Sequence, residues 1–381
     1  SADTFVNGQV TNTGALFFQG AISNRLVNSG SFNLNNNATL TVVPVNSGTF
    51  TVGNTLTVAP AWANASNVVL TGGAVAGGTV TNTGTLTGFG TVGALVNAGN
   101  WFVTNGTLNA GLVTNTGTLV GGAGGAVSAV FNTGTIQATN GTLTFLANSV
   151  NAGTLNVSAT AKFGASGELV FTNTGLVNLA GGTLIDRDLV NRGRVTGSGL
   201  ISNALVNDVT GFLLATNGTL VLTPDLVNLG VVTNSAALIV SNGATLGSVT
   251  NAGSIIMTGG TFSASVITNT GTVAGFGTVN GAILGGQITA TNGTLNLTSA
   301  PVSAAVNVAV TLNVTPAWTA SSVTLNGGVL AGGNTTNGGA FAGFGTISNL
   351  VFNTTHVLAT NGTLTVVNAF GGAGRSEEHT S

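Results

Sequence analysis

Apolar and polar residues alternate with a period of two in short segments along the whole chain. Between Val80 and Leu86, the two apolar residues flank Asn82 and Gly84, and all four stand two residues apart. Residues two apart share one face of a β-strand. If the strand runs unbroken, this frame predicts that the apolar side chains, the Asn and the Gly all face the interior.

The frame apolar-x-Asn-x-Gly-x-apolar recurs about every 15 to 23 residues, a spacing typical of solenoid repeats. Asn46 and Asn151 fit it less well, because Pro44 and Ser149 occupy the first apolar position. A buried Asn costs several kcal/mol unless its amide is paired, so we expect amides of successive turns to form an internal ladder. The alternative is that Asn-x-Gly only marks surface turns. The predicted ladder residues are Asn12, Asn28, Asn82, Asn97, Asn115, Asn132, Asn173, Asn191, Asn228, Asn251 and Asn269.

A second kind of strand follows an Asn-Gly pair. "NGTLTF" at 140–145 puts Leu143 and Phe145 on one face and Thr142 and Thr144 on the other. Both Asn and Gly tolerate positive φ, so each Asn-Gly pair predicts a turn. Similar blocks stand at 217–222, 292–297 and 361–366.

These patterns predict an all-β fold. Each of the 60 glycines would cost ~1 kcal/mol in a helix interior, and Thr and Asn are poor helix formers. An antiparallel hairpin sandwich is possible, but a period that holds along the whole chain favours one turn per repeat. We therefore predict a right-handed parallel β-helix, that is, a β-solenoid. With about 19 turns stacked ~4.8 Å apart, it would be roughly 90 Å long.

Larger blocks of the chain are also duplicated, since residues 60–78 match residues 316–333. No linker divides the chain, so residues 1–374 are predicted to form one elongated repeat domain, incomplete at both ends. The segment 299–318 is a candidate lateral insertion. In three "GFG" segments a Phe stands between two glycines and is expected to fill the core; these are Phe89, Phe276 and Phe344.

Composition narrows the class of protein. Only 4% of the 381 residues are charged, the net charge is −2 and there is no Cys. Without clustered Lys and Arg, the chain has no electrostatic footprint for nucleic acid or for an anionic membrane. No apolar run approaches the ~18 residues of a membrane helix. No cofactor motif is present, because Gly-x-Gly here lacks a following helix.

Titratable residues are too sparse to predict an enzyme. His356 is the only His before the tail and is expected in a solvent-facing loop. A charged cluster lies at 162–225, where Asp186 and Asp188 share one strand face. We interpret it as a solvated salt-bridge patch, with calcium at these two carboxylates as the alternative. The cluster comprises Lys162, Glu168, Asp186, Arg187, Asp188, Arg192, Arg194, Asp208 and Asp225.

Two further motifs carry weaker hypotheses. "TNT" segments could array Thr on a flat face as in ice-binding solenoids, but their uneven spacing in the sequence argues against it. Asn-Gly-Thr triplets match glycosylation sequons, although they coincide with the predicted turns. The triplets begin at Asn105, Asn140, Asn217, Asn292 and Asn361.

The runs "TNTGTL", "LVNAG" and "ATNGTLTV" resemble bacterial autotransporter-associated β-strand-repeat proteins and similar large secreted β-helix surface proteins. The resemblance covers residues 1–374 and implies a protein that is secreted or displayed at the bacterial cell surface. It predicts a non-enzymatic structural or adhesive stalk whose partners are carbohydrate or another cell surface. The alternative is a β-helix module of a secreted enzyme that binds or degrades polysaccharide.

The two ends of the chain differ in kind from its middle. The first residue is not Met, and no signal peptide follows, so we expect a cleaved or cut edge. The tail "RSEEHTS" at 375–381 breaks the composition and resembles a translated sequencing adapter, so it is expected to be non-native; a charged native tail is the alternative. Open solenoid ends expose strand edges, which predicts end-to-end self-association.

Overall fold

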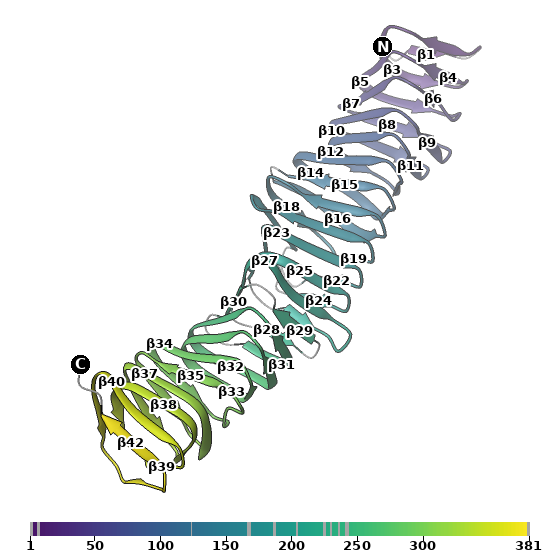
Figure 1. Ribbon diagram of the computed structural model, residues 1–381. Helices are drawn as coiled ribbons and strands as arrows, with labels where there is room; N and C mark the ends of the chain where they lie inside the picture. The colour runs from purple at the N-terminus through teal and green to yellow at the C-terminus, as the bar shows by residue number, and fades with distance from the viewer. Residues whose placement is uncertain are drawn as a thin grey trace. The chain divides into compact units, whose positions relative to one another are not determined.

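The structure is a computed structural model that describes residues 3–5, 8–122, 124–165, 169–185, 188–202, 205–223, 226–228, 231–234, 237–240 and 244–378. The chain forms two compact units, Ser1–Arg194 and Val195–Ser381. The described residues contain β-strands and no helix. Within each unit the strands stack as a parallel β-solenoid, of about 19 turns over the described chain (Figure 1). The predicted fold class is confirmed.

The strands of the first unit are β1 (Asp3–Phe5), β2 (Val10–Asn12), β3 (Ala15–Ile22), β4 (Leu26–Asn28), β5 (Ser31–Leu40), β6 (Val45–Asn46), β7 (Thr49–Val52), β8 (Thr55–Val58), β9 (Trp62–Asn64), β10 (Asn67–Gly77), β11 (Val80–Asn82), β12 (Thr85–Val92), β13 (Leu95–Asn97), β14 (Asn100–Asn115), β15 (Thr118–Gly121), β16 (Gly125–Asn132), β17 (Thr135–Ala138), β18 (Gly141–Phe145), β19 (Ser149–Asn151), β20 (Thr154–Ser158), β21 (Ala161–Ala165), β22 (Val170–Asn173), β23 (Leu176–Leu184) and β24 (Asp188–Asn191).

From the unit boundary onward they are β25 (Arg194–Ile201), β26 (Leu205–Asn207), β27 (Phe212–Leu222), β28 (Leu226–Asn228), β29 (Val231–Asn234), β30 (Ala237–Val240), β31 (Ala244–Asn251), β32 (Ser254–Asn269), β33 (Thr272–Leu284), β34 (Gln287–Leu297), β35 (Ala305–Val308), β36 (Thr311–Val314), β37 (Trp318–Gly332), β38 (Thr335–Ile347), β39 (Val351–Asn353), β40 (His356–Val366), β41 (Phe370–Gly371) and β42 (Arg375–Glu378).

Successive turns pair in parallel and keep the asparagines in register. In the first unit, β11 lies between β9 and β13, so that Asn64, Asn82 and Asn97 stand above one another. Turns of different length still align, because register shifts within the paired strands take up the extra residues, as between Gly88 and Gly90 of β12. Each three-residue stretch that ends in such an asparagine is called a ladder strand below.

The Gly of the repeat frame does not face the interior, because the strand does not run unbroken through the frame. The chain bends at residues 83–84, between β11 and β12, and Gly84 is half-exposed at this corner. A Cβ added to Gly84 would collide with the carbonyl oxygen of Ser66 in the turn below. The corner therefore requires Gly because two backbones approach closely, not because the interior needs a small residue.

The core consists of stacked aliphatic and aromatic side chains. In the first unit a run of aromatic rings crosses successive turns, with centroid distances of 5.6, 5.1 and 5.9 Å. Rings at such distances contribute about 0.5–1.5 kcal/mol per pair beyond the area they bury. The run comprises Phe18, Phe32, Phe50 and Trp62.

The Asn-Gly turns behave as predicted. Asn217, Asn292 and Asn361 have φ of 59°, 62° and 61°. In the block at 140–145, the positive φ of 85° is at Gly141, and Leu143 and Phe145 are fully buried. The turns let the following strand present its apolar face to the core.

The "GFG" phenylalanines lie outside the core, which corrects the expectation. Phe89 is 37% exposed, and Phe276 and Phe344 are half-buried. Gly88 and Gly90 have φ of 108° and 144°, so the chain turns Phe89 outward between them. The ring covers glycines of both neighbouring turns, since Cβ atoms added to Gly72 and Gly106 would lie 3.3 and 3.1 Å from it.

Segment 299–318 is not a lateral insertion. Its strands β35 and β36 pair in register with β34 on one side and β37 on the other. The segment therefore completes an ordinary turn of the second unit. At the end of the chain, the backbone of β42 pairs in parallel with β40, from Arg375 opposite His356 to Glu378 opposite Ala359.

Candidate functional site: the asparagine ladder and its gap

Eleven buried asparagines form one continuous ladder in the first unit. Each of the first ten donates Nδ2 to Oδ1 of the asparagine one turn on, over distances from 2.6 to 3.3 Å. The ladder is confirmed. In order it joins Asn12, Asn28, Asn46, Asn64, Asn82, Asn97, Asn115, Asn132, Asn151, Asn173 and Asn191.

Backbone carbonyls complete the bonding of each amide. Asn82 is fully buried and donates to Asn97 Oδ1 at 2.7 Å, Asn100 O at 3.0 Å and Gly84 O at 3.3 Å. A buried amide that is fully bonded carries no desolvation penalty from unmade hydrogen bonds. The buried asparagines therefore avoid the cost of unpaired amides, and their hydrogen bonds also connect neighbouring turns.

In the described part of the second unit, ladder bonds join asparagines in two stretches. Asn234 donates to Asn251 at 2.7 Å, and Asn251 donates to Asn269 at 2.6 Å. Further along, Asn337 donates to Asn353 at 2.7 Å. The backbone of Asn228 pairs with that of Asn207, but its side chain is outside the described part of the chain. The other ten predicted asparagines all take part in ladder bonds.

The frame was too strict to find every ladder residue. Asn46 and Asn151 belong to the ladder despite their poor fit. Asn64 was missed because Ser66 replaces the corner Gly, and Asn337 because Thr335 replaces the apolar residue. A frame that requires only Asn with an apolar or β-branched residue two positions before it would have found both.

The second ladder is interrupted between Asn269 and Asn337. Register places Leu284 beside Thr268 and Val302 beside Leu284, so that Gly285 and then Ser303 follow in the ladder position. Ala320 occupies it in the next turn, opposite Asn337. These three turns, called the ladder gap below, have no side-chain amide at that position.

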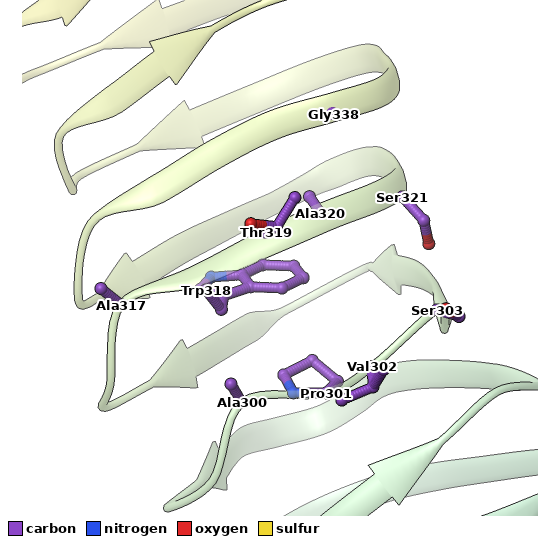
Figure 2. A pocket seen from close by; sticks show the side chains of 10 residues that line it. All are labelled: Ala300, Pro301, Val302, Ser303, Ala317, Trp318, Thr319, Ala320, Ser321 and Gly338. Atoms are coloured by element: carbon purple, nitrogen blue, oxygen red, sulfur yellow. The ribbon is translucent and has the colours of Figure 1, made fainter.

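A surface pocket of about 470 Å³ lies at the ladder gap (Figure 2). Trp318 and Pro301 lie in its middle, Ala300 and Ala317 at one end, and Ser303 and Ser321 at the other. None of its lining side chains is ionisable. The lining residues are Ala300, Pro301, Val302, Ser303, Ala317, Trp318, Thr319, Ala320, Ser321 and Gly338.

The missing N–H of Pro301 explains why the two turns are not joined by a backbone hydrogen bond at this pocket. In ladder strands the first N–H donates to a carbonyl of the next turn, as Val80 does to Ala94 at 2.9 Å and Trp62 to Thr79 at 3.1 Å. Pro301 occupies that position and has no N–H, so the equivalent bond to Ala317 cannot form. The backbone of Ser303 is also unusual, since it has a φ of 55° without being Gly or Asn.

Several of the predicted charged residues lie at the surface of the described chain. His356 is exposed, as expected, but begins β40 instead of lying in a loop. Lys162, Arg192 and Arg194 are exposed. The side chains of Asp186 and Asp188 are outside the described part, so the salt-bridge and calcium interpretations stay predictions. Among the described residues, no cluster of His, Asp or Glu could hold a metal ion.

Two broader findings bear on the class of protein. Within the described ranges, no helix has the length and apolar character needed to cross a membrane. The chain matches no protein-family model, no curated protein and no solved structure.

Proposed function

We propose that this protein is a non-enzymatic structural and adhesive β-solenoid, which serves as a stiff stalk or passenger of a bacterial surface protein and acts outside the cell. The observation that supports this most strongly is the ladder from Asn12 to Asn191, which joins eleven turns through ten side-chain bonds. An internal ladder adds to the backbone bonds between turns and so resists separation of the turns.

The surface composition supports an adhesive contact with an uncharged partner. Residues 26–161 include no Asp, Glu, Lys, Arg or His. Outward positions on neighbouring turns carry hydroxyls and amides, for example Thr49, Asn67 and Thr85, which stand in register on β7, β10 and β12. Such a surface offers hydrogen bonds without long-range electrostatic attraction, which suits neutral polysaccharide.

Single-molecule force spectroscopy tests the stalk. We expect the first unit of the full chain to resist pulling and to yield turn by turn, with lower forces after Asn115→Ala. Unfolding at forces that do not change when ladder asparagines are replaced would contradict a mechanical role for the ladder.

A sugar-release assay distinguishes the non-enzymatic stalk from the alternative, a module of a secreted enzyme that degrades polysaccharide. Polysaccharide-coated surfaces should retain the chain without release of reducing sugar. Release that disappears in Asp186→Ala or Asp188→Ala would replace the stalk with an enzyme, because paired carboxylates are the groups that glycoside hydrolysis needs.

A further inference from the structure

The two sequence copies around the tryptophans differ at the ladder position. Asn64 follows Trp62 in the first copy, whereas Ala320 follows Trp318 in the second. The preceding turn carries Pro44-Val45-Asn46 in the first copy and Pro301-Val302-Ser303 in the second. Each copy therefore has a proline turn next to a tryptophan turn, an arrangement called a Pro–Trp seam below.

A side-chain amide bond spans the first Pro–Trp seam. Pro44 lacks the same N–H, and β6 belongs to a separate sheet with β2 and β4, so the strand pairing breaks here too. Asn46 Nδ2 nevertheless donates to Asn64 Oδ1 at 3.3 Å, the longest bond of this ladder. The side-chain bond joins two turns whose backbones have separated.

The second Pro–Trp seam has lost both amides. Ser303 and Ala320 stand where the first seam has Asn46 and Asn64, and neither side chain can bridge the turns. Ser321 Oγ, which donates to Ala304 O at 2.8 Å, ties the turns at one end only. The open seam is the pocket of about 470 Å³. The two seams thus differ at the ladder position: a side-chain amide bond spans the first, and none spans the second.

The lining of the open seam defines the chemistry of a ligand. Pro301, Trp318 and Ala320 are buried in its wall, while Val302 is 51% exposed at its rim. Hydroxyls of Ser303 and Thr319 stand exposed beside them. The carbonyl of Ala317 lacks the N–H donor that this position receives in other turns. Apolar patches with a few hydroxyls and a carbonyl, and without charge, complement a ring that has both C–H and O–H groups.

We propose that the open Pro–Trp seam at Pro301 and Trp318 is a binding site for a neutral sugar unit of a glycan. The ring's C–H groups would contact Val302 and Pro301, and its hydroxyls would bond to Ser303, Thr319 and the Ala317 carbonyl. This site deepens the adhesive part of the proposed function and rests on it. The sugar would thus bind at the side of the solenoid, at turns that lack a ladder asparagine.

Saturation-transfer NMR and titration calorimetry on the full chain test the site. The probes are cellotriose, maltotriose and triacetylchitotriose, with trigalacturonate as the charged comparison. We expect at least one neutral trisaccharide to bind, and trigalacturonate to bind at least tenfold more weakly, because no cation lines the pocket. Failure of all three neutral probes, or a preference for trigalacturonate, would overturn the proposal.

Paired variants locate the binding. Thr319→Glu should weaken binding at least tenfold, whereas Thr336→Glu, in register one turn on and outside the pocket, should leave it within twofold. Val302→Glu repeats the test on the opposite rim should Thr319→Glu misfold. The double variant Ser303→Asn with Ala320→Asn should also weaken binding, since the two new amides could restore the bond that Asn46 and Asn64 make across the first seam. Unchanged affinity in these folded variants would overturn the site.

The site and the stalk can fail separately. If Thr319→Glu abolishes sugar binding and Asn115→Ala lowers the pulling forces of the first unit, both proposals hold. If neutral glycans bind elsewhere on the chain, the seam proposal falls and the adhesive stalk remains. If ladder variants leave pulling forces unchanged while the seam binds sugar, the stalk role falls and the site remains.

Discussion

Each ladder asparagine both satisfies a buried polar side chain and ties one turn to the next. Asn115 is fully buried, accepts from Asn97 at 2.6 Å and donates to Asn132 at 2.6 Å. Its amide also lies 3.2 Å from the carbonyl oxygens of Gly117 and Thr135. Loss of one amide therefore leaves a donor in one neighbouring turn and an acceptor in the other without their partner.

Asn115→Ala should lower the free energy of unfolding by about 2–5 kcal/mol, because each buried group left unpaired costs about 1–3 kcal/mol. Chemical denaturation of the full chain measures the loss. The matched control is Asn109→Ala, an exposed asparagine of the same strand β14, which should change stability by less than about 0.5 kcal/mol. Equal effects at the two positions would mean that the ladder does not stabilise the fold.

The corner glycines make a second residue-level prediction. Gly84→Ala should destabilise by about 1–3 kcal/mol, since its Cβ would press on the Ser66 carbonyl and backbone must shift to relieve it. Gly93→Ala is the control, because an added Cβ there meets nothing closer than Val75 O at 4.0 Å. Thermal unfolding compares the two, and a control that loses as much stability as Gly84→Ala would refute the steric explanation.

At the scale of elements, the glycine-flanked phenylalanines pack on the outer surface of the solenoid, where each ring contacts the turns on both sides. Phe89 leaves the core because Gly88 and Gly90 turn the chain, and its ring then covers the turns on either side. Phe276 repeats this contact with Gly259 and Gly293. An aromatic ring can thus stabilise adjacent turns from outside where a bend interrupts the core-facing strand.

Phe89→Ala should destabilise the first unit by about 1–3 kcal/mol, less than truncation of a core Phe, because 37% of the side chain is already exposed. Phe17→Ala is the comparison, since Phe17 is 64% exposed and should lose less. Hydrogen exchange at β10 and β14 reports the local effect. Unchanged protection there would show that the ring does not hold these turns together.

Sequence periodicity predicted the strands and the ladder, because a period of two and a buried amide leave few structural alternatives. It misplaced Phe89, since alternation does not show where glycines bend a strand outward. The open Pro–Trp seam was beyond its reach for another reason. The duplicated blocks show that Ala320 replaces the asparagine that follows Trp62, but turns of unequal length hide which residues lie opposite one another. Only the register places Pro301 and Ser303 beside the Trp318 turn.

At the scale of the whole molecule, stability should follow the ladder. A solenoid turn contacts only its neighbours, so stability is roughly a sum of turn and interface contributions. The first unit has an unbroken ladder over eleven turns, whereas the second unit has the ladder gap at Gly285, Ser303 and Ala320. The ladder gap is therefore the place where turns should separate first.

Hydrogen exchange followed by mass spectrometry can map this opening along the full chain. We expect backbone amides of Trp318–Ala320 to exchange about tenfold or more faster than those of β13, because local opening there breaks fewer bonds between turns. Ala320→Asn should slow exchange at Trp318–Ala320 by restoring one rung to Asn337, and should leave β13 unchanged. If the ladder gap exchanges as slowly as β13, side-chain amides contribute little to cohesion, and the backbone strands alone hold the turns together.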